Sequence, residues 1–148
     1  MLYLGIVIFI FTTELVIKHT VETHLQEGKD RKTLHGLFLL TKYHNKDAVF
    51  NLASGYRKAV KILAVLLTLL LTIVFVCTLG QKGKRLLKLG LAFLLGGAFS
   101  NTYDRMKKGY VVDYIRINTR RERIRRIIFN LSDFFILVGA MITAIEMP

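Results

Sequence analysis

The sequence predicts an all-α polytopic membrane protein with four transmembrane helices, a small extracytoplasmic β-strand region and an interfacial amphipathic helix. Of the 148 residues, 53% are hydrophobic, and the mean hydropathy is +0.43. Four segments are apolar over about 20 residues, the length that a helix needs to cross a bilayer. No internal repeat or low-complexity linker divides the chain, so residues 1–148 are predicted to form one membrane domain.

The four predicted membrane helices differ in how many charged residues interrupt their apolar sequence. They cover about residues 2–21, 60–79, 86–103 and 127–146. The second is the clearest, because residues 62–79 contain no charged side chain. In the first, Glu14 and Lys18 interrupt the apolar run one helical turn apart, where an acid and a base face each other. The N-terminus lacks a basic region and a cleavage site, which favours a retained helix over a removed signal.

Two loops, residues 22–59 and 104–126, are too polar to cross a membrane. In the first, "LHGLFLLTKYHNKDAVF" has the short apolar runs and turn residues of strands. The following "NLASGYRKAVK" predicts a short amphipathic helix lying at the interface. In the second loop, "YVVDYI" predicts a further strand.

The formal charge of +12 predicts anionic lipid headgroups as partners, since so apolar a chain without a nucleic-acid-binding motif does not favour nucleic acid. The basic run "RRERIRR" is a candidate for this contact, although a solvated loop explains it equally well. Basic residues concentrate in the two long loops, which the positive-inside rule alone places in the cytoplasm. The single Cys77 and the spacing of the histidines predict no disulfide, no metal site and no cofactor.

Two groups of Asn and Asp residues lie where apolar segments meet the interface. They belong to "NTYDRMKKGYVVDYI", residues 101–115, and "FNLSD", residues 129–133. A carboxylate near hydrocarbon costs roughly 2.5 kcal/mol or more, so it indicates a functional site. If the third and fourth spans pack together, Asp113 and Asp133 face each other across a cleft, one protonated and one acting as a base. Such a pair activates water against an amide bond. Structural capping explains the same spacing equally well.

The combined motif resembles the signature of the lipoprotein signal peptidase (signal peptidase II) family. That signature runs Asn-x-x-Asp-Arg, a spacer with Gly, Val-Val-Asp-Phe and later Phe-Asn-x-Ala-Asp. It falls here on Asn101, Asp104, Arg105, Gly109, Val111, Val112, Asp113, Phe129, Asn130 and Asp133, with Tyr114 for Phe and Ser132 for Ala. The resemblance covers nearly the whole chain. It implies an aspartyl endopeptidase of the bacterial inner membrane that cleaves diacylglyceryl-modified prolipoproteins before the lipidated cysteine.

The resemblance also implies roles for individual residues. Asp113 and Asp133 would form the catalytic dyad. The substrate would be bound by Asn45, Asn101, Arg105 and Asn130, and the site supported by Glu14, Lys18, Asp104 and Gly109.

Two departures from the family pattern stand out in the first half of the chain. Glu14 replaces an Asp, and Asp47 replaces the Gly of an Asn-x-Gly-Ala-Ala-Phe stretch that begins here at Asn45. The family works as a multi-pass protein with its active site on the extracytoplasmic face, opposite to what charge alone predicts. We adopt that orientation, and we expect a monomer.

Two other functions are compatible with the sequence. One is a non-catalytic membrane protein that binds lipidated peptides, against which both costly carboxylates argue. The other is a small transporter with Asp113 and Asp133 as a proton relay, against which the lack of repeats and broken helices argues.

Overall fold

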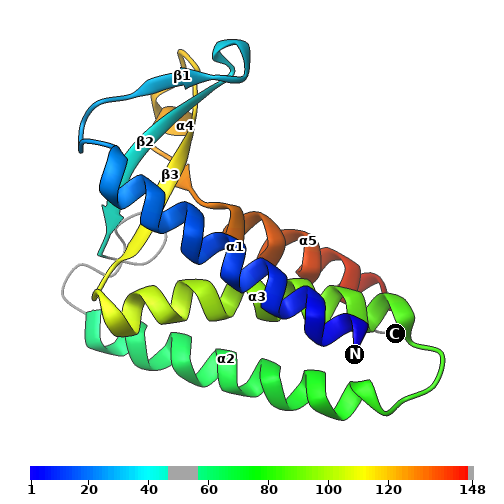
Figure 1. The fold of residues 1–148 in the computed structure, drawn as a ribbon. Coiled ribbons are helices and arrows are strands. Elements are labelled where there is room, and N and C mark those ends of the chain that lie inside the picture. The colour runs from blue at the N-terminus through cyan, green and yellow to red at the C-terminus, as the bar shows by residue number, and fades with distance from the viewer. Residues whose placement is uncertain (47–56, 147–148) are drawn as a thin grey trace.

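A computed structural model describes residues 1–46 and 57–146 of the chain. Its long helices are α1 (Leu2–His24), α2 (Arg57–Leu79), α3 (Arg85–Lys107) and α5 (Leu131–Glu146). Figure 1 shows them side by side, with a small sheet at the end where α1 and α3 finish and where α2 and α5 start. Helix α3 contacts each of the other three and so forms the centre of the bundle.

The membrane-spanning character is strongest in two of these helices. Helices α1 and α2 have mean hydropathies of 1.7 and 3.0 over their most apolar stretches, and both are long enough to cross a membrane. Helix α5 has 16 residues in the described part, about 24 Å at the usual rise, which is less than the thickness of a typical hydrocarbon core. The last two turns of helix α3 consist mostly of polar residues.

The sheet contains β1 (Arg31–Thr33), β2 (Phe38–Asn45), β3 (Val111–Ile117) and β4 (Ile128–Phe129) in that order, all antiparallel. Two short helical segments, η1 (Leu34–Gly36) and α4 (Glu122–Arg125), lie in its connections. The prediction of a small strand region is therefore confirmed. Strand β2 pairs with β3 so that Tyr43 lies opposite Asp113, which places the end of β2 beside the predicted catalytic residue.

Helix α3 continues four residues beyond the predicted span, to Lys107. Asp104 and Arg105 are therefore helical and do not belong to the predicted loop 104–126, and Asn101 lies in the helix as predicted. Hydropathy falls in this stretch, but the helix persists because the inward-facing polar side chains have partners from α1 and β3.

Helix α5 begins at Leu131, four residues after the start predicted for the fourth span. The Asn130 side chain accepts a hydrogen bond from the Asp133 backbone N–H at 3.0 Å, and the Asp133 carboxylate accepts one from the Asn130 N–H at 3.1 Å. This reciprocal capping fixes the helix start. The two residues before it, Ile128 and Phe129, pair with β3 as strand β4.

The predicted interfacial helix at residues 51–61 lies partly outside the described residues. From Arg57 onward its residues form the first turn of α2. That part of the prediction is wrong, because the apolar sequence that follows continues the same helix without a break. Residues 47–50, which include Asp47, also lie outside the described part of the chain.

Backbone contact joins α3 to α5. A Cβ on Gly139 would lie 2.6 Å from the Gly90 carbonyl oxygen, and one on Gly97 would lie 2.5 Å from the Ser132 carbonyl oxygen. Only glycine allows so close an approach at these two positions. The helix that carries Asp133 is thereby held directly against the helix that carries Asn101.

Candidate active site

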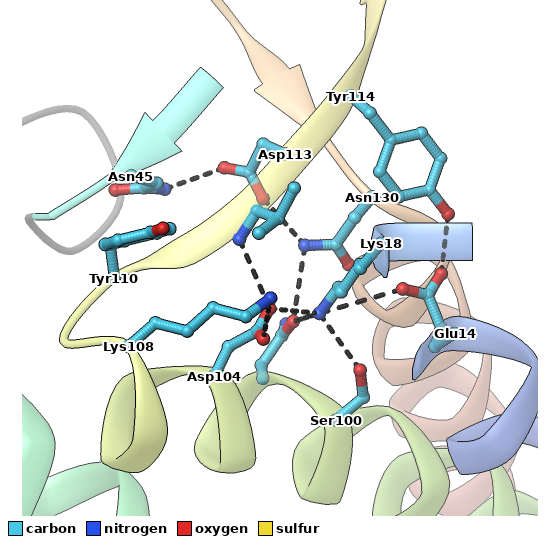
Figure 2. A network of polar contacts seen from close by, with 12 residues as sticks. Glu14, Lys18, Asn45, Ser100, Asp104, Lys108, Tyr110, Asp113, Tyr114 and Asn130 are labelled. Carbon is cyan, nitrogen blue, oxygen red and sulfur yellow. Dashed lines mark hydrogen bonds and ion pairs between the residues drawn. The ribbon is translucent and has the colours of Figure 1, made fainter. Parts of the chain in front are cut away.

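Asp113 lies near the middle of β3 and is 2% exposed. Its carboxylate accepts hydrogen bonds from Asn45 Nδ2 at 2.9 Å and from Asn130 Nδ2 at 2.7 Å, as Figure 2 shows. Burial, together with the charge of Asp133, raises the pKa of Asp113 to about 7, although the two amide hydrogen bonds and Lys18 act in the opposite direction. A carboxyl group of this kind can hold a proton at neutral pH and still give it up.

Asp133 lies in the first turn of α5. One carboxylate oxygen accepts a hydrogen bond from Asn101 Nδ2 at 2.8 Å, and the other accepts the capping bond from the Asn130 backbone. Asp133 therefore caps helix α5 and is also linked to the other candidate carboxylate, that of Asp113. The two interpretations that the sequence left open do not exclude each other.

Two asparagine side chains connect the carboxylates. Asn130 Nδ2 contacts Asp113 and also donates to Asn101 Oδ1 at 3.2 Å. Lys18 Nζ donates to the same Asn101 oxygen at 2.8 Å. Because a lysine ammonium can only donate, it turns the Asn101 carbonyl oxygen toward itself and the amide NH₂ toward Asp133. The amide orientations follow from this lysine.

Lys18 lies at the centre of a buried support layer beneath the carboxylates. Its side chain is 1% exposed and lies 3.1 Å from Asp104, 3.7 Å from Glu14 and 2.9 Å from Ser100 Oγ. Asp104 also contacts Lys108 at 2.9 Å and accepts a hydrogen bond from the Val112 backbone N–H at 3.2 Å. The layer thus ties α1 and α3 to the strand residue that precedes Asp113 (Figure 2).

Glu14 and Tyr114, two of the departures from the family pattern, contact each other. The Tyr114 hydroxyl donates to Glu14 Oε1 at 2.7 Å and accepts a hydrogen bond from the Leu131 backbone N–H at 3.2 Å. Burial, with the charge of Glu14, raises the pKa of Tyr114, so its hydroxyl remains a donor. A phenylalanine in this place would leave the glutamate without that donor.

Arg105 occupies a different position from the amide residues. It lies close enough to Asp113 and Asp133 to interact with their charges, yet it donates no hydrogen bond to the residues that the structure describes. It lines a pocket of about 250 Å³ together with Lys46, Arg57, Lys58, Lys61 and Gly109. Gly109 has a φ of +81°, which lets the chain turn from α3 into β3 beside that pocket.

The site has the elements of acid–base chemistry. Within the described part of the chain, no group of three or more His, Cys, Asp or Glu residues is placed to hold a metal ion. The carboxylates are instead held by amides and backbone N–H groups.

Sequence reasoning missed Ser100 and Tyr114 as buried polar partners. It also missed Lys108, although its i,i+4 spacing from Asp104 could have indicated the ion pair.

A model of the family described as "Signal peptidase (SPase) II" matches residues 6–148. The chain is 32% identical over 148 residues to a lipoprotein signal peptidase of Pseudomonas paraeruginosa, covering 98% of this chain and 86% of that protein. It is 28% identical over 147 residues to the lipoprotein signal peptidase of Bacillus subtilis, covering 99% and 93%.

A solved structure described as "Bacterial membrane enzyme structure by the in meso method at 2.3 A resolution" has a similar fold. Its TM-score is 0.80 at 22% identity, and the match covers 97% of this chain and 85% of that one. The match of the family model along nearly the whole sequence is decisive, and the chain belongs to the signal peptidase II family.

Proposed function

We propose that this protein removes signal peptides from diacylglyceryl-modified prolipoproteins by cleaving before the lipidated cysteine, with Asp113 and Asp133 as an aspartyl dyad. One observation carries the assignment of the dyad. The two carboxylates are linked through Asn130 and Asn101, and burial beside Asp133 raises the pKa of Asp113 to about 7. A pair in which one member keeps a proton is what water-mediated amide hydrolysis requires.

Asp113 acts as the acid in this mechanism and Asp133 as the base. Asp133 takes a proton from water as the water oxygen bonds to the scissile carbonyl carbon, and Asp113 gives its proton to the carbonyl oxygen. The C–N bond of the resulting gem-diol then breaks. Asp133 passes its proton to the leaving nitrogen, and one diol hydroxyl returns a proton to Asp113. Both carboxyl groups end in their starting states.

The remaining site residues divide into two roles. Asn45, Asn101 and Asn130 orient the carboxylates through the bonds described above and bind the substrate backbone beside them. Arg105 has guanidinium donors available for substrate, because none is used by a described residue. The support of the site falls to Glu14, Lys18, Asp104 and Gly109.

The chain is a bacterial membrane protein by its family, and we infer that it is a monomeric multi-pass protein in which α1, α2, α3 and α5 cross the inner membrane. Exposed apolar side chains along α2 and α5, such as Ile62, Leu66 and Leu137, fit contact with lipid. The sheet and the dyad would then lie on the extracytoplasmic face, where lipoprotein substrates present their cleavage site. Basic residues of the loop 116–126 would contact anionic headgroups.

The test uses purified protein in detergent with a synthetic diacylglyceryl-modified prolipoprotein. We expect Asp113→Asn and Asp133→Asn to abolish cleavage while remaining folded. Asp30→Asn is the matched control, because Asp30 pairs with Arg116 in the sheet and does not contact the dyad. Tight binding without cleavage by the wild type would instead identify a lipidated-peptide binder. Proton flux in vesicles without cleavage would identify a transporter.

A further inference from the structure

The pocket next to Arg105 is lined almost entirely by cations. Its lining contains Lys46 directly after β2, residues Arg57, Lys58 and Lys61 from the first turns of α2, and Arg105 from α3. No acidic residue is among the described residues that line it. Bringing so many positive charges together is unfavourable unless an anion is close by. Arg105 already lies close to the charges of Asp113 and Asp133, so the lysines of the pocket are the cations that an anionic ligand would neutralise.

The donors around the pocket indicate a ligand with several acceptor oxygens. Lys61 Nζ donates to the Met106 backbone carbonyl oxygen at 3.3 Å, which leaves its other two N–H groups available. Lys58, one turn earlier on α2, has no hydrogen-bond acceptor among the residues that the structure describes, so its three N–H groups are available as well. A phosphate group presents its oxygens to lysine ammonium groups, and charge-assisted bonds of this kind are among the strong ones.

The surroundings of the pocket indicate that this phosphate belongs to a lipid. Immediately after Lys61, the side chains of Ile62 and Leu63 are 59% and 56% exposed, and Leu66 one turn later is 57% exposed. They start the most hydropathic helix of the chain. An apolar helix face that begins at a basic pocket matches a phospholipid, whose phosphate lies at the interface and whose acyl chains extend into the hydrocarbon.

We propose that Lys58 and Lys61 bind the phosphate of an anionic phospholipid whose acyl chains lie along the exposed face of α2. This goes beyond the proposed cleavage, because the diacylglyceryl group of a prolipoprotein contains no phosphate. Lipid binding is measured without a peptide substrate. Its failure can therefore be distinguished from a failure of the proposed peptidase activity.

The experiment measures lipids retained by the intact detergent-purified protein in native mass spectrometry. The protein is titrated with phosphatidylglycerol or with phosphatidylcholine of the same acyl chains. We expect one tightly held phosphatidylglycerol and weaker phosphatidylcholine. Each basic side chain near an anionic headgroup strengthens binding roughly fivefold, so Lys58→Gln with Lys61→Gln should weaken phosphatidylglycerol binding about 25-fold. The matched control is Lys82→Gln with Lys84→Gln, which removes the same charge beyond the other end of α2.

Three results would overturn the proposal. The first is equal retention of both lipids by the wild type. The second is equal loss of binding in the control and in the Lys58 and Lys61 variant, which would indicate a general effect of net charge. The third is displacement of the lipid by the same concentration of inorganic phosphate, which would identify a site for a free anion. Melting curves of both variants, measured by circular dichroism, check that each remains folded.

Discussion

The contact between Tyr114 and Glu14 gives the sharpest prediction for stability. Tyr114 is 4% exposed and Glu14 is 0% exposed, and their hydrogen bond joins residues 100 positions apart in the sequence. Tyr114→Phe removes the hydroxyl and little else. A hydrogen bond to a charged group contributes about 1.5–3 kcal/mol, and the Leu131 N–H at the start of α5 loses an acceptor as well. We therefore expect the free energy of unfolding to fall by roughly 2–3 kcal/mol.

The assay is a double-mutant cycle in one detergent, with unfolding followed by denaturant titration. Tyr114→Phe, Glu14→Gln and the double variant are compared with wild type. We expect a coupling energy of about 1–2 kcal/mol between the two substitutions. Tyr43→Phe is the control, because Tyr43 is 41% exposed. Additive effects, or a Tyr114→Phe variant as stable as the control, would refute the idea that this bond supports the site.

Three further predictions follow from the same contacts. The pKa of Asp113, about 7, lies above its ordinary value of 3.8, so its contribution to stability is complete below pH 4 and is lost as the pH rises toward 7. Cleavage should decline with an apparent pKa near 7, and a rate that is flat to pH 9 would contradict Asp113 as the acid. Lys18→Met leaves buried carboxylates without their cation, so the free energy of unfolding should fall by about 3–5 kcal/mol. The control is Lys88→Met, which should change it little in the same denaturant titration. Gly139→Ala forces α3 and α5 apart, so it should lower the free energy of unfolding by about 1–3 kcal/mol and lower the thermal midpoint. The control is Gly5→Ala, whose added Cβ meets nothing within 4 Å and which should not lower the thermal midpoint.

The sequence predicted the parts of this protein that local pattern decides. The run "YVVDYI" is rich in β-branched and aromatic residues, and most of it lies in β3. The apolar stretch from residue 62 onward lies in α2. The Asn and Asp motif brought together residues that the structure joins through the amides of Asn101 and Asn130.

What the sequence did not predict depends on tertiary contact. Hydropathy ended the third span at residue 103, but α3 continues because Lys18 of another helix neutralises Asp104 within it. The contact between Glu14 and Tyr114 could not be predicted from the sequence, because no residue pattern near either position indicates the other. Strand β1 consists of three exposed residues that pair with β2. So short and exposed a strand has no hydrophobic pattern that would predict it from the sequence.

The glycine contacts between α3 and α5 also limit how a substrate can reach the dyad. Two helices whose backbones touch at Gly90 and Gly139, and again at Gly97 and Ser132, leave no width for a polypeptide between them. The two helices therefore form one closely packed unit, and separating them would break packing along most of the length of α5. A lipid-borne substrate that diffuses in the plane of the bilayer therefore has to arrive laterally on another side.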